Sequence, residues 1–133
     1  MYKILVVDDE SIEREGISFL IEKYKFPLEV AQATNGKTAL EYMRTHPIDI
    51  LLTDVKMPQM DGLELARHTF EKYPDVRILV FSAYGEFEFA KKAMAAQAVS
   101  YLLKPIEVDE FQRVMAQILA RCDELAEKKK DEQ

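Results

Sequence analysis

Four apolar runs of the sequence each end in side chains that could bind or accept a phosphoryl group. The residues that follow these runs are Asp8 and Asp9, Asp54, Ser82, and Lys104. If the runs are parallel strands connected by helices, their carboxyl ends share one edge of the sheet, where ligands bind in open α/β sheets. Each residue alone has an ordinary explanation as a cap, a turn residue or a solvated charge. Their occurrence after four separate strands favours a common site.

The three carboxylates predict a metal ion at this site. Like charges within a few ångströms of one another are costly unless a cation lies among them. Mg²⁺ prefers oxygen ligands and is typically held by one or two carboxylates together with phosphate oxygens. With the metal drawing charge from an incoming phosphate, the Asp54 carboxylate could attack phosphorus and form an aspartyl phosphate. Lys104 would then pair with the phosphoryl oxygens, and Ser82 would donate a hydrogen bond to them.

The elements that must position these residues follow from the periodicity of the sequence. Strand-like and helix-like periods alternate, as in an α/β domain with a mainly parallel sheet. Strands are expected at about 2–7, 28–33, 48–53, 78–81 and 101–103. Helices are expected at about 11–24, 36–46, 61–73, 86–97 and through 111–125. In the first helix, one stripe is formed by Ile12, Gly16, Phe19, Leu20 and Lys23.

Composition limits the class of protein. A chain of 133 residues, 48% of them apolar and 32% charged, is expected to form one globular domain. No apolar run approaches the roughly 20 residues of a membrane helix, and the start lacks the features of a signal peptide, so a cytoplasmic location is expected. The net charge of −6 argues against direct binding to nucleic acid. The single cysteine, Cys122, cannot form an internal disulfide and is expected to be half-buried on the last helix.

Four segments resemble, in order, the signature segments of the receiver domain of two-component response regulators. The likeness extends from Lys3 to about Cys122. Ala98 and Ser100 stand where many receivers have glycine and aspartate, but neither position carries the chemistry. The matching segments are Val7-Asp8-Asp9-Glu10, Asp54-Val55-Lys56-Met57-Pro58-Gln59-Met60-Asp61-Gly62, Phe81-Ser82-Ala83-Tyr84 and Tyr101-Leu102-Leu103-Lys104-Pro105.

The resemblance implies a flavodoxin-like (βα)5 fold, a doubly wound parallel sheet with strand order 2-1-3-4-5. It also implies that Asp54 accepts a phosphoryl group from a sensor histidine kinase. By the same resemblance, Asp9 and Asp54 ligate Mg²⁺ directly, Asp8 helps through water, and the backbone carbonyl of Lys56 completes the protein ligands.

In the family, phosphorylation is read out by two switch residues, which match Ser82 and Tyr101 here. The hydroxyl moves toward the phosphoryl group and the ring turns inward, which reshapes the face built from the fourth helix, fifth strand and fifth helix. The Lys104-Pro105 bond is expected to be cis. Such a protein catalyses only its own phosphorylation and dephosphorylation, so it is not expected to be an enzyme acting on external substrates.

The resemblance leaves the downstream use of the switch open. Residues 1–122 are expected to form the receiver, and 123–133 the end of the last helix or the start of a linker. The segment 84–90 is similar to receivers that precede AraC-type helix-turn-helix domains, and Phe87 or Phe89 could face a partner. We therefore expect pairing of two copies on phosphorylation and DNA contact only through an output domain absent from this chain. The alternative is a stand-alone receiver that acts by protein–protein interaction or phosphorelay.

Two further motifs are discounted. The run 35–38, Asn-Gly-Lys-Thr, is similar to the end of a phosphate-binding loop, but the first glycine that such a loop requires is replaced by Ala31. His46 and His68 are expected on helix surfaces far from the strand ends, so neither is a good candidate for a phosphorelay histidine or a metal ligand.

Overall fold

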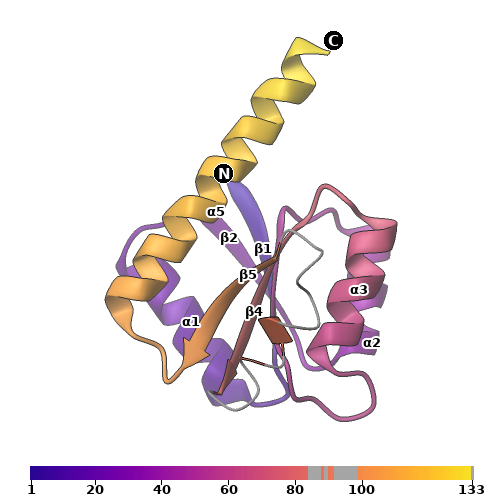
Figure 1. Ribbon diagram of the computed structural model, residues 1–133, viewed down its shortest axis with the longest axis vertical. Coiled ribbons are helices and arrows are strands. Elements are labelled where there is room, and N and C mark those ends of the chain that lie inside the picture. The colour runs from indigo at the N-terminus through magenta and orange to yellow at the C-terminus, as the bar shows by residue number, and fades with distance from the viewer. Residues whose placement is uncertain (84–87, 89, 92–98, 133) are drawn as a thin grey trace.

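The chain folds around a five-stranded parallel sheet with strand order β2-β1-β3-β4-β5, as expected for a flavodoxin-like domain (Figure 1). The computed structural model describes residues 1–83, 88, 90–91 and 99–132. The elements are β1 (Tyr2–Val7), α1 (Ser11–Lys23), β2 (Leu28–Ala33), α2 (Gly36–Thr45), β3 (Ile50–Asp54), α3 (Gly62–Lys72), β4 (Arg77–Ala83), β5 (Val99–Lys104) and α5 (Val108–Asp131). Every strand pairing is parallel. The predicted fold class and strand order are therefore confirmed.

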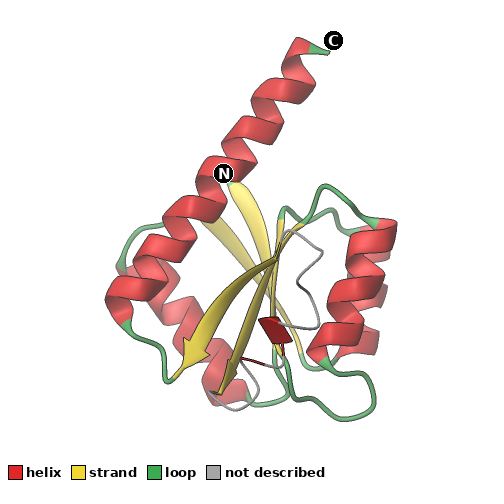
Figure 2. Cartoon of the chain, in the orientation of Figure 1, coloured by secondary structure: helices red, strands yellow, loops and turns green. Residues whose placement is uncertain are grey.

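Helices cover the sheet on both faces (Figure 2). On one face, α1 and α5 bury side chains such as Ile17 and Phe111 against Ile4 and Leu52 of the sheet. On the other face, α2 and α3 pack against strand residues such as Leu5 and Leu51. The strands therefore need apolar side chains in both directions, which explains why β1 and β3 read as continuous apolar runs in the sequence.

The face of α1 that packs on the sheet differs from the predicted stripe. Ile17 and Ile21 are 1% and 2% exposed, whereas Ile12 and Phe19 of the predicted stripe are 79% and 61% exposed. Ile17 and Ile21 are four residues apart and lie one above the other on the helix. The predicted stripe was wrong because α1 carries apolar residues on more than one side, and spacing alone does not say which side is buried.

Side chains cap the amino-terminal ends of α2 and α3. The Asn35 side chain accepts a hydrogen bond of 2.8 Å from the Thr38 backbone amide. The Thr38 hydroxyl in turn accepts one of 3.3 Å from the Asn35 backbone amide. This reciprocal pair caps α2, so the Asn-Gly-Lys-Thr run has a structural role. At α3, the Asp61 carboxylate accepts a hydrogen bond of 2.8 Å from the Glu64 amide.

The charged run at the end of the sequence continues α5 as a helix to Asp131. The last buried side chain of α5 is Cys122, and the turns that follow it project beyond the sheet (Figure 1). Two polar contacts join this region to the rest of the domain. The Tyr2 hydroxyl donates a hydrogen bond of 2.5 Å to Asp123, and Lys129 lies 2.8 Å from Asp75 in an ion pair.

Part of the expected structure lies outside the described residues. This holds for most of the fourth helix expected at about 86–97, and for Tyr84, Phe87, Phe89 and Ala98; residues 88, 90 and 91 are helical. The Lys104-Pro105 peptide bond is cis, as expected. Among the helices that the structure describes, none combines the length and the apolar character needed to cross a lipid bilayer.

Candidate functional site

The register of the sheet brings the predicted site residues to one edge. Val7 pairs with Thr53, so Asp8 and Asp9 emerge beside the end of β3, where Asp54 lies. Asp54 pairs with Phe81, and Ala83 pairs with Lys104. Ser82 lies within β4 rather than after it, because this strand continues to Ala83. The aligned ends of the parallel strands thus bring these residues to one edge of the sheet, as the sequence predicts.

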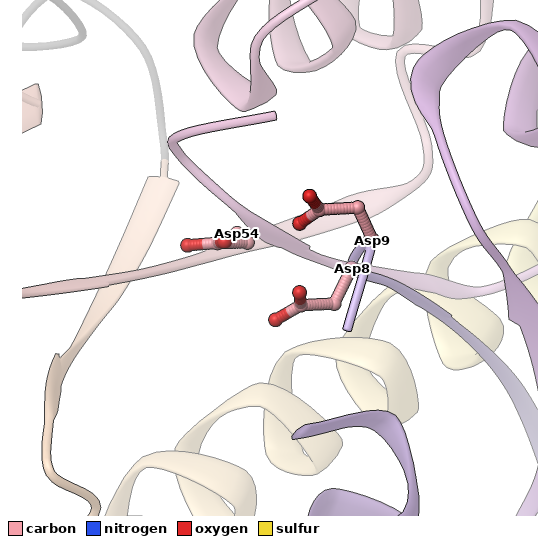
Figure 3. Close-up of side chains that lie close together, drawn as sticks. All are labelled: Asp8, Asp9 and Asp54. Atoms are coloured by element: carbon pink, nitrogen blue, oxygen red, sulfur yellow. The ribbon is translucent and has the colours of Figure 1, made fainter. Parts of the chain in front are cut away.

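Three carboxylates gather at this edge. Asp8, Asp9 and Asp54 each offer an oxygen within 4.8 Å of the others, and their carboxyl groups extend toward the same region (Figure 3). Asp8 and Asp54 are buried, at 2% and 6% exposure, while Asp9 is exposed. The cluster therefore combines two buried acids with one that faces solvent.

Burial of the Asp8 carboxylate is unfavourable for its charged form. Its Oδ1 accepts a hydrogen bond of 2.9 Å from the Glu10 amide, while its buried Oδ2 has no hydrogen-bond partner among the described residues. Burial raises the Asp8 pKa to about 6, the Glu10 amide opposes this shift, and the charge of Asp54 adds to it. A hard divalent cation accepts carboxylate oxygens as ligands. The oxygen donors of this cluster, including Oδ2, which accepts no hydrogen bond from the described residues, fit such a cation.

Lys104 provides the cation that the chain itself contributes to the site. Its ammonium donates a hydrogen bond of 3.1 Å to Asp54 Oδ1 and lies 3.8 Å from Asp8 Oδ2. Burial alone would lower the Lys104 pKa, but the charge and hydrogen bond of Asp54 and the charge of Asp8 outweigh it, so the pKa is raised. Lys104 thus remains charged at neutral pH, between the two buried carboxylates.

Ser82 and Tyr101, the two residues that match the family's switch pair, lie on adjacent strands. The Ser82 side chain is 1% exposed, and its Oγ has no hydrogen-bond partner within the described part of the chain. The Tyr101 hydroxyl donates a hydrogen bond of 3.5 Å to the Ala90 carbonyl, and burial raises the Tyr101 pKa. A buried hydroxyl without a partner costs free energy, so Ser82 is poised to donate to a group that arrives at this edge.

The loop after β3 is shaped by a close approach of two backbone segments. The Gly62 amide donates a hydrogen bond of 2.7 Å to the Val55 carbonyl. A Cβ at position 62 would lie 1.8 Å from the carbonyl oxygen of Asp54, so only glycine fits. Lys56, whose backbone carbonyl is a predicted ligand, lies in this loop with an exposed side chain. Gly62 therefore fixes the path of the loop beside Asp54.

Arg14 contacts the site and was missed by sequence reasoning. From the amino-terminal part of α1, its Nη1 donates a hydrogen bond of 2.7 Å to the backbone carbonyl of Asp8. A cation near the start of a helix opposes the helix dipole. The sequence carries no signal for this contact, because the acceptor is a backbone carbonyl, a group that every residue has.

The two histidines do not reach the site. Both are exposed. His68 lies on α3, as predicted, whereas His46 is the residue that follows the last turn of α2, where its ring stacks on Tyr42 with 4.2 Å between ring centroids.

Comparison with known proteins identifies the family. The family model described as the response regulator receiver domain matches residues 4–116. The transcriptional regulatory protein YesN of Bacillus subtilis, described as uncharacterized, is 40% identical over 121 residues, which are 90% of this chain and 33% of YesN. The transcriptional regulatory protein ZraR of Klebsiella oxytoca is 33% identical over 88% of this chain and 26% of its own length. The chain thus spans a third or less of these two curated relatives.

Solved structures agree with this assignment. A two-component transcriptional regulator AraC from Clostridium phytofermentans superposes with a TM-score of 0.83 at 33% identity, covering 93% of this chain and 97% of that one. The REC domain of AraT, a response regulator from Geobacillus stearothermophilus, has a TM-score of 0.79 at 38% identity, covering 96% and 98%. The chain therefore belongs to the response regulator receiver domain family.

Proposed function

We propose that this chain is a phosphorylation switch that accepts a phosphoryl group from a sensor histidine kinase on Asp54, in a reaction that requires Mg²⁺. The observation that carries the proposal is the grouping of Asp8, Asp9 and Asp54 within 4.8 Å, with the Lys104 ammonium 3.1 Å from Asp54. These are the groups needed to hold a divalent cation, to attack phosphorus and to stabilise the charge of the transferred group.

The acidic cluster provides the candidate metal ligands. Asp9 and Asp54 would bind Mg²⁺ directly, Asp8 through water, and Lys56 through its backbone carbonyl. A bound Mg²⁺ supplies charge neutralisation for the carboxylates and for the incoming phosphoryl oxygens. Asp8 Oδ2 supports this assignment. It accepts no hydrogen bond within the described part of the chain, and a buried carboxylate oxygen gains from a cation or water brought to it.

Asp54 is the proposed nucleophile. One of its carboxylate oxygens attacks phosphorus, and the bond between phosphorus and the imidazole nitrogen of the kinase breaks. The electron pair of that bond returns to the imidazole ring, and the product is an aspartyl phosphate. Lys104 already contacts Asp54 Oδ1 and would pair with the oxygens of the transferred group. Hydrolysis of the acyl phosphate by water returns the carboxylate.

Ser82 and Tyr101 are the proposed readout. The Ser82 hydroxyl would donate to a phosphoryl oxygen and so gain the partner it lacks among the described residues. Movement of Ser82 changes the space beside Tyr101 on the adjacent strand, and the ring would turn inward. This would alter the surface formed by β5 and α5.

The proposed output is control of transcription by a DNA-binding domain outside this chain. The support is that YesN and ZraR are named as transcriptional regulatory proteins and are longer than this chain. The chain itself carries a net charge of −6, which disfavours direct contact with DNA. The proposal includes phosphorylation-dependent pairing of two copies and a location in the cytoplasm.

Intact mass spectrometry after incubation with acetyl phosphate tests the proposed acceptor. We expect one phosphoryl group on the wild type in the presence of Mg²⁺, none with a chelator, and none on Asp54→Asn. Asp109→Asn, at an exposed position in the first turn of α5, is the matched control and should be modified like the wild type. An adduct that persists on Asp54→Asn, or no adduct on the wild type, would overturn the proposal.

A second measurement separates a switch from a phosphatase. The modified protein should lose its own phosphoryl group over time and should not hydrolyse an excess of a phosphate monoester. Sustained release of phosphate from the monoester, in amounts well above that of the protein, would identify an enzyme instead.

A further inference from the structure

Arg14 belongs to a chain of hydrogen bonds that runs from the edge strand β2 to the loop carrying Asp8 and Asp9. Its Nε donates a hydrogen bond of 3.0 Å to the Gln32 side chain, and its Nη1 donates one of 2.7 Å to the Asp8 carbonyl. The side-chain amide of Gln32 in turn donates a hydrogen bond of 3.3 Å to the Ser18 hydroxyl. That hydroxyl donates one of 2.9 Å to the backbone carbonyl of Arg14. The guanidinium thus bridges the Gln32 side chain and the Asp8 carbonyl, and Ser18 connects Gln32 to the Arg14 backbone.

We propose that Arg14 is a positioning residue for the metal site, and that it acts by fixing the peptide plane between Asp8 and Asp9. The inference rests on the proposed function, since it concerns the binding of Mg²⁺ by these two residues. Arg14 touches neither carboxylate in this role. It orients both through the backbone that joins them.

The geometry of the peptide bond gives the reason. The Asp8 carbonyl and the Asp9 amide form one rigid plane. A hydrogen bond to that carbonyl therefore limits rotation on both sides of the plane, and so limits the directions in which the two side chains leave the backbone. The Asp8 amide is held by the Ala33 carbonyl at 3.3 Å, and Asp8 Oδ1 by the Glu10 amide at 2.9 Å. Arg14 adds a restraint on the carbonyl that follows.

The charge of Arg14 makes the proposal separable from simple electrostatics. A guanidinium near the acidic cluster repels an incoming Mg²⁺, so removing its charge should strengthen Mg²⁺ binding if charge were its only effect. Loss of a positioning contact should weaken binding instead, because partners that orient metal ligands typically contribute about tenfold or more to metal affinity. The two roles therefore predict opposite signs.

The test is the dissociation constant for Mg²⁺, measured by titration calorimetry on the full chain without any phosphoryl donor. For Arg14→Met we expect a dissociation constant raised about tenfold. Arg14→Lys, which keeps the charge and one donor, should recover part of the affinity. Gln32→Leu should have a smaller effect, and combining it with Arg14→Met should add nothing, because both changes break the same chain of hydrogen bonds.

Arg44→Met is the matched control. It removes the same charge from an exposed position in the last turn of α2 and should leave the dissociation constant unchanged. A dissociation constant that falls in Arg14→Met would overturn positioning in favour of charge. An unchanged constant, with lower thermal stability of the metal-free protein, would show a purely structural role. No binding of Mg²⁺ by the wild type would overturn the proposed function together with this inference.

Discussion

At the scale of single residues, Asp8 links stability to function. Its carboxylate is buried, one of its oxygens lacks a hydrogen-bond partner among the described residues, and it lies in a cluster with the charged Asp54. We predict that Asp8→Asn raises the free energy of unfolding by about 1 kcal/mol at neutral pH in the presence of a chelator. The reason is that burial, which raises the Asp8 pKa to about 6, outweighs the attraction of the Lys104 ammonium 3.8 Å away. Urea denaturation of the two proteins measures the difference.

Saturating Mg²⁺ provides the internal control for this prediction. The cation should stabilise the wild type more than Asp8→Asn, since it binds the native cluster and the variant offers a weaker ligand set. The difference between the two proteins should then shrink or reverse. A variant less stable than the wild type in chelator would contradict the view that the metal-free cluster costs stability.

Cys122 gives a pH dependence that is independent of the site. Burial raises the pKa of its thiol from 9.0 to about 11, the charge of Asp49 adds to the shift, and Arg77 opposes it. The unfolded chain therefore loses this proton first, and between pH 9 and 11 the folded state binds more protons than the unfolded state. The stabilisation is fully present below pH 9 and is lost as pH rises toward 11.

The measurement compares the wild type with Cys122→Ala. Relative to this variant, the wild type should lose about 2 kcal/mol of its unfolding free energy across that interval, as measured by urea denaturation at successive pH values. Other groups titrate in both proteins and cancel in the difference. A difference independent of pH would show that the thiolate is tolerated in the folded state.

Residue types and their order predicted the members of the site better than its supports. Asp8, Asp54 and Lys104 were found because parallel strands that end together bring their following residues together. Ser82 was found in the same way. That its hydroxyl has no hydrogen-bond partner among the described residues depends on packing that no pattern encodes. Arg14 acts on a backbone carbonyl, and Gly62 acts by the absence of a side chain, so neither has a chemical signature in the sequence.

At the scale of elements, the loop between β3 and α3 depends on one glycine. A methyl group at position 62 would meet the Asp54 backbone, which cannot withdraw without disturbing β3. We predict that Gly62→Ala lowers the free energy of unfolding by about 2 kcal/mol or more, the range of overpacked sites. It should also weaken Mg²⁺ binding, because the displaced Asp54 belongs to the acidic cluster.

Gly16→Ala in α1 is the matched control. A Cβ at position 16 meets nothing within 4 Å. Alanine is favoured over glycine inside a helix, so this change should raise the free energy of unfolding by about 0.5 to 1 kcal/mol. Chemical denaturation of both variants distinguishes local contact from general glycine effects. Equal effects of the two substitutions would mean that the contact at Gly62 does not constrain the loop.

Helix α1 shows why spacing did not settle which face is buried. Its 13 residues place Ile12 and Phe19 on one side and Ile17 and Ile21 on another. Both sets satisfy helical periodicity, and only the position of the sheet decides between them. In α5, by contrast, the sequence predicts one apolar stripe, and most of it is buried. The buried members are Phe111, Val114, Met115, Ile118 and Cys122, whereas Leu119 and Leu125 are partly exposed.

At the scale of the whole molecule, the proposed switch predicts a change in assembly. We expect the phosphorylated protein to sediment as a dimer and the unmodified protein as a monomer at the same concentration. The physical reason is a change in the surface over β5 and α5 when Tyr101 changes its position. Analytical ultracentrifugation before and after treatment with acetyl phosphate and Mg²⁺ measures the mass of each species.

Asp54→Asn treated in the same way is the control and should remain monomeric. An unchanged mass for fully modified wild type would contradict pairing, while leaving phosphorylation itself intact. A dimer in both states would indicate that assembly is independent of the switch.

The overall fold was predictable because it follows from one rule applied along the chain. Alternating strand and helix periods specify a parallel sheet, and continuous apolar strands such as β1 and β3 require cover on both faces. Strand order does not follow from periodicity, and here it came from the resemblance of motifs such as the one around Asp54. The sequence does not decide whether the last residues extend α5 or form a linker, since a charged run is compatible with both.

The last turns of α5 extend beyond the part of the helix that packs on the sheet. The last buried side chain of α5 is Cys122, and the helix ends nine positions later at Asp131, a distance of about 14 Å at the usual helical rise. A tilt of the buried turns would move the end of the helix farther than its base and would break the ion pair of Lys129 with Asp75. A pair of spectroscopic labels, one near Asp131 and one on the outer face of α2, would therefore convert a small rotation of α5 into a readable change in distance.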